Sequence, residues 1–116
     1  MIQELCKIRD IQHAINRYEF DFEKLHGISL NEGMVLCSLS NADRLSSGEL
    51  GELLGLTPSN TSKVIASVEK KKLIKRMLGK TDKRQMYFHI SDKGKEYLES
   101  IKCGELDLPE ALKDII

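Results

Sequence analysis

The fold is inferred first from residues 57-TPSNTSKVIASVEKKKLIKR-76. This stretch opens with a helix start, because threonine is a good N-cap and proline is favoured at the first helical position. One side of the following helix is apolar and recurs at i, i+3, i+4 and i+7. That side comprises Thr61, Val64, Ile65 and Val68. The opposite side is polar and cationic, and comprises Ser59, Asn60, Ser62, Lys63, Ser67 and Lys70. The helix is therefore predicted to pack by its apolar side and to present the polar one.

A second short helix is predicted directly before this one. Ser46 and Glu49 form a capping-box pattern, in which a hydroxyl caps the helix start and a carboxylate follows three residues later. The leucines of this helix are Leu50, Leu53 and Leu54. It ends at Gly55, and only the turn Gly55-Leu56-Thr57 separates it from the next helix. Two short helices joined by a tight glycine-containing turn form a helix-turn-helix, here about residues 46–72.

A β-hairpin is predicted after the helix-turn-helix. Residues 74–78 favour a strand, residues 79–83 (GKTDK) favour a turn, and residues 85–90 alternate with the period of a strand. Met86, Phe88 and Ile90 face one way, and Gln85, Tyr87 and His89 face the other. A hairpin in this position is a wing, about residues 74–90.

The two ends of the chain are predicted to be helical. Residues 2–25 form a long helix whose apolar seam has alternating three- and four-residue spacing, a pattern that packs helix on helix. The seam comprises Ile8, Ile11, Ile15, Tyr18, Phe22 and Leu25. Residues 92–102 return to helix with Tyr97, Leu98 and Ile101 inward, and Asp107 and Pro109 are placed to start a last short helix.

Between the long helix and the helix-turn-helix, Ser29 and Glu32 form another capping-box pattern. It introduces a short apolar helix in which we expect Cys37 to lie in the core. Residues 1–116 are within the size of one domain. The predicted fold is mainly α: a winged helix-turn-helix with a small antiparallel β-hairpin.

The net charge is zero, with 18 basic and 18 acidic residues, but it is unevenly distributed. Residues 57–90 hold nine basic and two acidic residues, a net charge of +7. The flanking residues 1–56 and 91–116 carry net charges of −4 and −3. A local patch governs docking onto a polyanion, because charges separated by more than ~8 Å are largely screened.

The basic segment matches the needs of a DNA-binding protein, since neutralising phosphates with Lys or Arg releases counterions. A major groove admits one helix, and the groove-facing residues must be small or able to hydrogen-bond. Ser59, Asn60, Ser62, Lys63 and Ser67 meet this requirement. The basic wing residues Lys80, Lys83 and Arg84 would reach the flanking backbone or the minor groove.

Other interpretations remain open. A Ser/Asn/Lys face is often only solvated, and the lysines 70–72 often only confer solubility. Some winged helices bind protein rather than DNA, although such versions tend to lose the basic wing tip that this chain keeps. Neither a nucleophile–base pattern nor a phosphate-binding glycine loop appears, so an enzyme is not expected.

The sequence resembles the MarR (multiple antibiotic resistance regulator) family of bacterial winged-helix repressors from about Ser46 to Leu98. The resemblance rests on 50-LGELLGLTPSNTSKVIASVEKKKLIKR-76, 82-DKR-84 and 90-ISDKG-94. It implies that Arg84 enters the minor groove, with Asp82 bracing either Arg84 or the wing, and that Ser62 and Lys63 contact DNA. It also implies a homodimeric regulator, a repressor, on a pseudo-palindromic operator.

The resemblance further implies that helices at about residues 2–25 and 92–116 form the dimer interface. The candidate interface residues are Ile8, Ile11, Ile15, Leu112, Ile115 and Ile116. The alternative is that the seam covers the chain's own core. Two departures stand out: Lys72 occupies a position where the family often has glycine, and few residues follow Gly104.

Sensing is less clearly marked in the sequence. Family resemblance implies a small apolar or phenolic effector in a cleft between the dimer helices and the winged domain. Cys6 is a candidate redox sensor, because some relatives sense peroxide through a first-helix cysteine, although it also fits an ordinary helix cysteine. No zinc-ligand spacing, cofactor motif, signal peptide or membrane span appears, so we expect a cytoplasmic protein without metal or cofactor.

Overall fold

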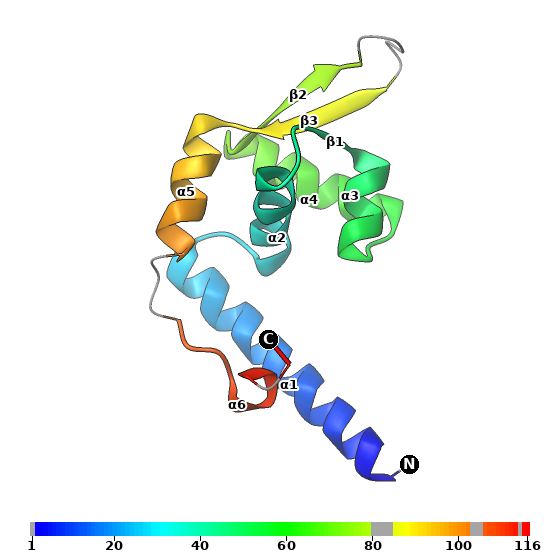
Figure 1. The fold of residues 1–116 in the computed structure, drawn as a ribbon, viewed down its shortest axis with the longest axis vertical. Helices are drawn as coiled ribbons and strands as arrows, with labels where there is room; N and C mark the ends of the chain where they lie inside the picture. Colours follow the sequence, from blue (N-terminus) through cyan, green and yellow to red (C-terminus); the bar gives the residue numbers. More distant parts are fainter. Residues whose placement is uncertain (1, 80–84, 103–105, 114) are drawn as a thin grey trace. The chain divides into compact units, whose positions relative to one another are not determined.

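The computed structural model describes residues 2–79, 85–102, 106–113 and 115–116. Figure 1 shows a mainly helical chain with one small sheet, which confirms the predicted fold class. The elements in order are α1 (Ile2–His26), α2 (Leu30–Ser40), β1 (Leu45–Ser46), α3 (Ser47–Leu54), α4 (Pro58–Lys70), β2 (Ile74–Leu78), β3 (Met86–Ile90), α5 (Asp92–Lys102) and α6 (Glu110–Lys113).

The chain divides into two compact units. One combines Met1–Leu30 with Gly104–Ile116, and we call it the terminal unit. The other, Asn31–Cys103, contains the helix-turn-helix and the sheet, and we call it the winged unit. Helix α5 belongs to the winged unit, although the sequence grouped it with the dimerisation helices.

The sheet has three antiparallel strands in the order β1-β3-β2. The predicted hairpin is present, and its register runs from Ile74 opposite Ile90 to Leu78 opposite Met86. The sequence missed β1, which places Leu45 opposite Phe88. A strand of two residues has no alternation to detect, so only its pairing partner reveals it.

The helix-turn-helix forms as predicted, with its caps in place. The Ser46 side chain accepts a hydrogen bond from the Glu49 amide (3.1 Å), and the Glu49 carboxylate accepts one from the Ser46 amide (3.0 Å). Gly55 ends α3 in the left-handed conformation, with φ of 68°. Thr57 caps α4 by accepting from the Asn60 amide (3.2 Å). The turn between the helices is therefore fixed by local chemistry.

The winged unit has a continuous apolar core. The apolar sides of α2, α3, α4 and the sheet meet in it, with Val35, Leu36, Leu39, Leu50, Ile65, Val68, Leu73, Ile74 and Phe88 buried. The apolar side predicted for α4 is therefore confirmed. The expectation for Cys37 was wrong, because this residue is exposed. Helix α2 is apolar nearly all round, but it buries only one side, and Cys37 falls on the other with Met34.

The start of α5 closes tightly against the corner between α4 and β2. Ser91 donates its hydroxyl to the Lys72 carbonyl (2.8 Å) and accepts the Gly94 amide (3.0 Å). A Cβ on Gly94 would lie 2.1 Å from the Leu73 carbonyl oxygen. The 90-ISDKG-94 motif therefore serves packing: Ser91 caps α5, and Gly94 allows α5 to lie close to the Leu73 carbonyl.

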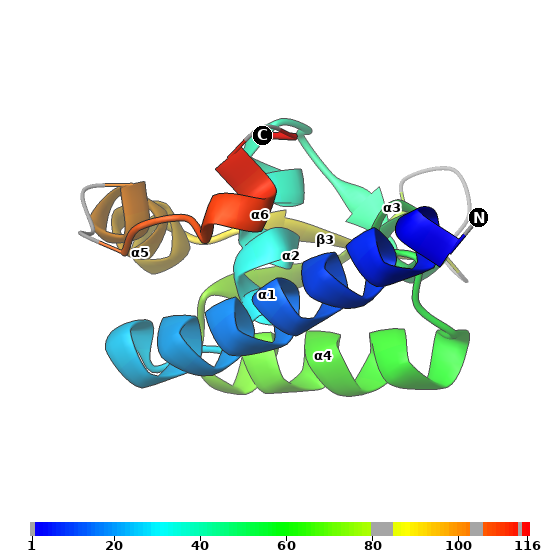
Figure 2. The ribbon, with the colours of Figure 1, turned by 90° about the horizontal axis from the view of Figure 1, so that it is seen from below.

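The terminal unit consists of α1 and α6, which lie side by side (Figure 2). Gly27, with φ of 74°, follows the last residue of α1. Phe22 is buried and contacts the rings of Tyr18 and His26. Leu112, one of the predicted dimer-interface residues, is buried within the chain itself.

Candidate nucleic-acid interface

Helix α4 presents an exposed stripe on the side opposite to its buried residues. The stripe follows the i, i+3, i+4, i+7, i+11 spacing of one helix face and comprises Ser59, Ser62, Lys63, Ala66 and Lys70, all exposed. Asn60, in the first turn, is exposed beside it. We call these six residues the α4 stripe. Four of the five α4 residues predicted to contact DNA thus lie together at the N-terminal half of this surface.

Ala66 was not among the predicted residues, yet it lies in the middle of the stripe. A methyl side chain there leaves the backbone of α4 accessible, which a helix needs in order to enter a groove closely. The helical spacing from Ser59, Ser62 and Lys63 could have identified it.

Ser67 differs from the other predicted residues. It is partly buried, and its hydroxyl donates to the Glu32 carboxylate of α2 at 3.1 Å. The hydroxyl is therefore directed toward α2 rather than along the α4 stripe. One turn later, Lys71 places its ammonium 2.8 and 3.0 Å from the same carboxylate. The lysine run thus has two kinds of member, since Lys70 and Lys72 are exposed and Lys71 is partly buried.

The first turn of α4 contains no acidic residue. Its N-terminus therefore carries the positive end of the helix dipole without a neutralising side chain in that turn. Together with Lys63, this favours an anion at the start of the stripe. A helix N-terminus of this kind suits a phosphate.

The predicted wing residues Lys80, Asp82, Lys83 and Arg84 lie outside the described residues. The strands that lead to them are described, and the ends of β2 and β3 nearest to them point away from the helices (Figure 1). On β2, Lys75 is exposed. Arg44, before β1, stacks over the Tyr87 ring with its guanidinium carbon 4.3 Å from the ring centroid. Cationic side chains therefore continue from α4 onto the sheet.

Arg76 of β2 binds Glu69 of α4, and one of the two hydrogen bonds measures 2.6 Å. Hydrogen bonding to the guanidinium lowers the pKa of the Glu69 carboxyl below its ordinary value. The same guanidinium lies 5.7 Å from the centroid of the Phe88 ring. This pair connects α4 with β2, so the two candidate DNA-contacting elements are held together by a directional contact.

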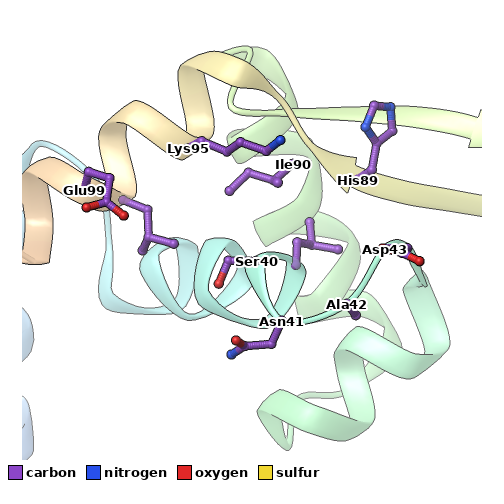
Figure 3. A pocket seen from close by; sticks show the side chains of 10 residues that line it. Ser40, Asn41, Ala42, Asp43, His89, Ile90, Lys95 and Glu99 are labelled. Carbon is purple, nitrogen blue, oxygen red and sulfur yellow. The ribbon is translucent and has the colours of Figure 1, made fainter.

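The winged unit also contains an open cavity of about 520 Å³. It lies between the C-terminal end of α2, the end of β3 and α5 (Figure 3). The apolar residues of its lining are Leu39, Ala42, Ile90 and Leu98, and the polar ones are Ser40, Asn41, Asp43, His89, Lys95 and Glu99. Its size is within the range of small-molecule sites. The charges around it are of both signs and select no ligand class.

Cys6 of α1 is exposed, as a redox sensor requires. Among the described residues, no group of three or more His, Cys, Asp or Glu side chains could hold a metal ion. Within the same residues, no helix combines the length and the apolar character that crossing a membrane requires.

Comparison with known proteins adds to this geometry. A model described as the MarR family matches residues 28–86. The chain is 31% identical over 88 residues to the uncharacterized HTH-type transcriptional regulator YkoM of Bacillus subtilis, a match covering 76% of this chain and 57% of YkoM. The chain thus spans little more than half the length of that relative.

Two solved structures show the same fold. The transcriptional regulator BldR of Sulfolobus solfataricus has a TM-score of 0.78 at 22% identity, covering 98% of this chain and 77% of BldR. The MepR protein of S. aureus, solved as a complex with DNA, has a TM-score of 0.67 at 23% identity, covering 82% of this chain and 78% of MepR. With a family model that matches half of its length, the chain belongs to the MarR family of transcriptional regulators.

Proposed function

We propose that this protein is a sequence-specific DNA-binding transcriptional regulator, a repressor, that acts as a homodimer on a pseudo-palindromic operator. The observation that carries the proposal is the α4 stripe, which is hydroxyl-rich, cationic and exposed on a helix whose other side is firmly buried. The MepR–DNA complex supports a duplex as the partner of this fold.

In this proposal Asn60 and Lys63 read bases, because asparagine pairs well with adenine and lysine with guanine. Ser59 and Ser62 contact bases or phosphates, and the first turn of α4 takes a phosphate. Arg84 enters the minor groove at the wing tip, where Asp82 braces it and Lys80 and Lys83 meet the backbone. Ser67 is better assigned to holding α4 against α2 than to DNA.

The homodimer is supported by apolar side chains that a single chain leaves exposed in the terminal unit. On α1, Ile8 is 52% and Ile15 37% exposed, and at the other end of the chain Ile115 is 63% and Ile116 80% exposed. A second copy would cover them, while Ile11 is already half-buried. Two α4 helices would then enter successive major grooves about 34 Å apart.

We further propose that a small apolar or phenolic effector relieves repression. Such an effector is what the family resemblance implies. A redox response through Cys6 is the alternative, supported by the exposure of that thiol.

The experiment that tests DNA binding is fluorescence anisotropy of the full chain against a pool of random duplexes at several salt concentrations. We expect affinity to fall steeply with salt, and selection from the pool to yield an operator with two related half-sites. Asn60→Ala and Lys63→Ala should each cost about 1–3 kcal/mol on the operator and little on random DNA. Lys113→Ala, which removes an exposed lysine from α6, is the matched control.

The alternative function is a winged-helix domain that binds a protein instead of DNA. A folded chain that binds no duplex at low salt would favour this alternative and overturn the proposed function. Equal losses on operator and random DNA for Asn60→Ala and Lys63→Ala would show that these residues do not read bases.

A further inference from the structure

The C-terminal half of α4 is held by one carboxylate from α2. Glu32, in the first turn of α2, is only 5% exposed. Its carboxylate accepts the Ser67 hydroxyl at 3.1 Å and the Lys71 ammonium at 2.8 and 3.0 Å. Ser67 and Lys71 are one helical turn apart, so the two contacts follow one side of α4 and share a single acceptor group.

The hydrogen bonds from Ser67 and Lys71 to Glu32 depend on direction, whereas the neighbouring apolar contacts do not. The apolar packing of Ile65 and Val68 allows α4 to rotate slightly about its axis, because the hydrophobic effect is not directional. A buried carboxylate is stable only while its hydrogen bonds are made. Rotating α4 about its axis, or sliding it along α2, would break the contact at Ser67 or Lys71. Glu32 therefore fixes the angle at which the α4 stripe is presented.

We propose that Glu32 is a positioning residue for DNA reading, acting through Ser67 and Lys71 on the recognition helix. The inference rests on the proposed function, since it assumes that the α4 stripe reads bases. Glu32 itself is buried behind α4 and has no access to a duplex. Its effect is to place Asn60 and Lys63 at the angle that base contacts require.

A charge argument separates this role from a general contribution to folding. Glu32→Gln removes one negative charge close to the proposed DNA surface and releases the Lys71 ammonium from its ion pair. Non-specific binding depends on the number of cations available to phosphates. Affinity for random DNA should therefore stay the same or rise, while affinity for the operator falls. Simple destabilisation would lower both affinities together.

The test uses the full chain, the operator selected with the wild-type protein, and a random duplex. Anisotropy gives both dissociation constants for wild type, Glu32→Gln and Glu32→Ala, with circular dichroism confirming the folded state at the working temperature. We expect the operator-to-random affinity ratio to fall about tenfold, the order of one lost base contact. Glu96→Gln, at an exposed glutamate of α5, is the matched control and should leave the ratio unchanged.

An unchanged ratio in folded Glu32 variants, or an equal loss on both duplexes, would overturn the proposal. Where Glu32 variants fail to fold, the Ser67→Ala variant is the test, because it removes one α4 contact of Glu32 and leaves the Lys71 ion pair in place. It should lower the ratio several-fold and leave random binding unchanged, and a constant ratio would refute the role of Glu32. Failure of the wild-type protein to bind any duplex would instead refute the proposed function.

Discussion

Lys72 occupies a backbone conformation that suits glycine. Its φ of 64° lies in the left-handed region, and no other non-glycine residue of the described ranges has a positive φ. The Lys72 amide binds the Glu69 carbonyl (2.9 Å) and the Leu73 amide binds the Val68 carbonyl (3.2 Å), the paired bonds of a Schellman motif. Glycine, which the family resemblance led us to expect at the position of Lys72, would adopt this conformation without strain.

Lys72→Gly should therefore stabilise the protein by up to about 1 kcal/mol, because the left-handed conformation costs a residue with a Cβ roughly that much. Urea denaturation measures the change. Lys70→Gly is the matched control: Lys70 is the last residue of α4, and the same substitution there should destabilise by up to about 1 kcal/mol. Changes of the same sign at both positions would contradict this account of Lys72.

Gly94 is a position where even a methyl group does not fit. Its added Cβ would lie 2.1 Å from the Leu73 carbonyl oxygen and 2.8 Å from Ile90 Cγ1, so backbone must move. Gly94→Ala should lower the free energy of unfolding by about 1–3 kcal/mol or more. Gly48→Ala, whose Cβ would meet nothing closer than 3.9 Å, should be neutral or slightly stabilising in the same urea titrations.

The Glu69–Arg76 pair joins α4 to β2 and makes this connection sensitive to pH. The pKa of Glu69 is lowered in the folded state, mainly by its hydrogen bond to Arg76. The pair therefore contributes stability that is fully present above the unfolded pKa of about 4.3 and is lost as pH falls through the folded pKa. Glu69→Gln should be less stable than wild type at pH 7, and the difference should shrink as pH falls below about 4.3. A difference that stays constant in urea titrations down to acid pH would contradict this.

The lysine run offers a second prediction about α4. Lys70 is exposed on the α4 stripe, whereas the Lys71 ammonium is bound to Glu32. Lys70→Gln should therefore lower the slope of log K against log salt by about 1, the loss of one phosphate contact. Lys71→Gln, its neighbour and matched control, should change the slope much less. Equal changes would show that the ion pair with Glu32 opens on DNA.

Elements whose ends depend on residues within one helical turn could be predicted from the sequence. Features that depend on contacts with residues far away in the sequence could not. The caps at Ser46 and Thr57 and the glycine at Gly55 act within one turn, so the helix-turn-helix could be placed closely. Strand β1 depends on pairing with β3, and the exposure of Cys37 depends on which side of an apolar helix is covered. The orientation of Ser67 depends on Glu32, which is 35 residues away in sequence.

The terminal unit and the winged unit differ in how many of their large apolar side chains are exposed. Among its described residues, the winged unit exposes three large apolar side chains, Met34, Leu53 and Leu78, whereas α1 alone exposes Ile2, Leu5, Ile8, Ile15, Phe20 and Leu25. Phe22 is buried, so part of the seam covers the chain's own core, and Leu112 is buried on α6, which packs on α1. Ile8 and Ile15, in contrast, are exposed, and their place in a dimer interface stays a prediction.

Replacing Ile8 and Ile15 together with glutamate should convert the proposed dimer into a monomer, because two charges would be buried in an apolar interface without partners. Light scattering after size-exclusion chromatography gives the mass, which should fall from two chains to one. Operator affinity should fall steeply in the same variant, since two linked half-site contacts become one. Leu53→Glu is the matched control for mass, because Leu53 is 64% exposed on the winged unit, and this variant should remain dimeric. A wild-type monomer that still binds the full operator tightly would show that α1 is not the element that pairs two recognition helices.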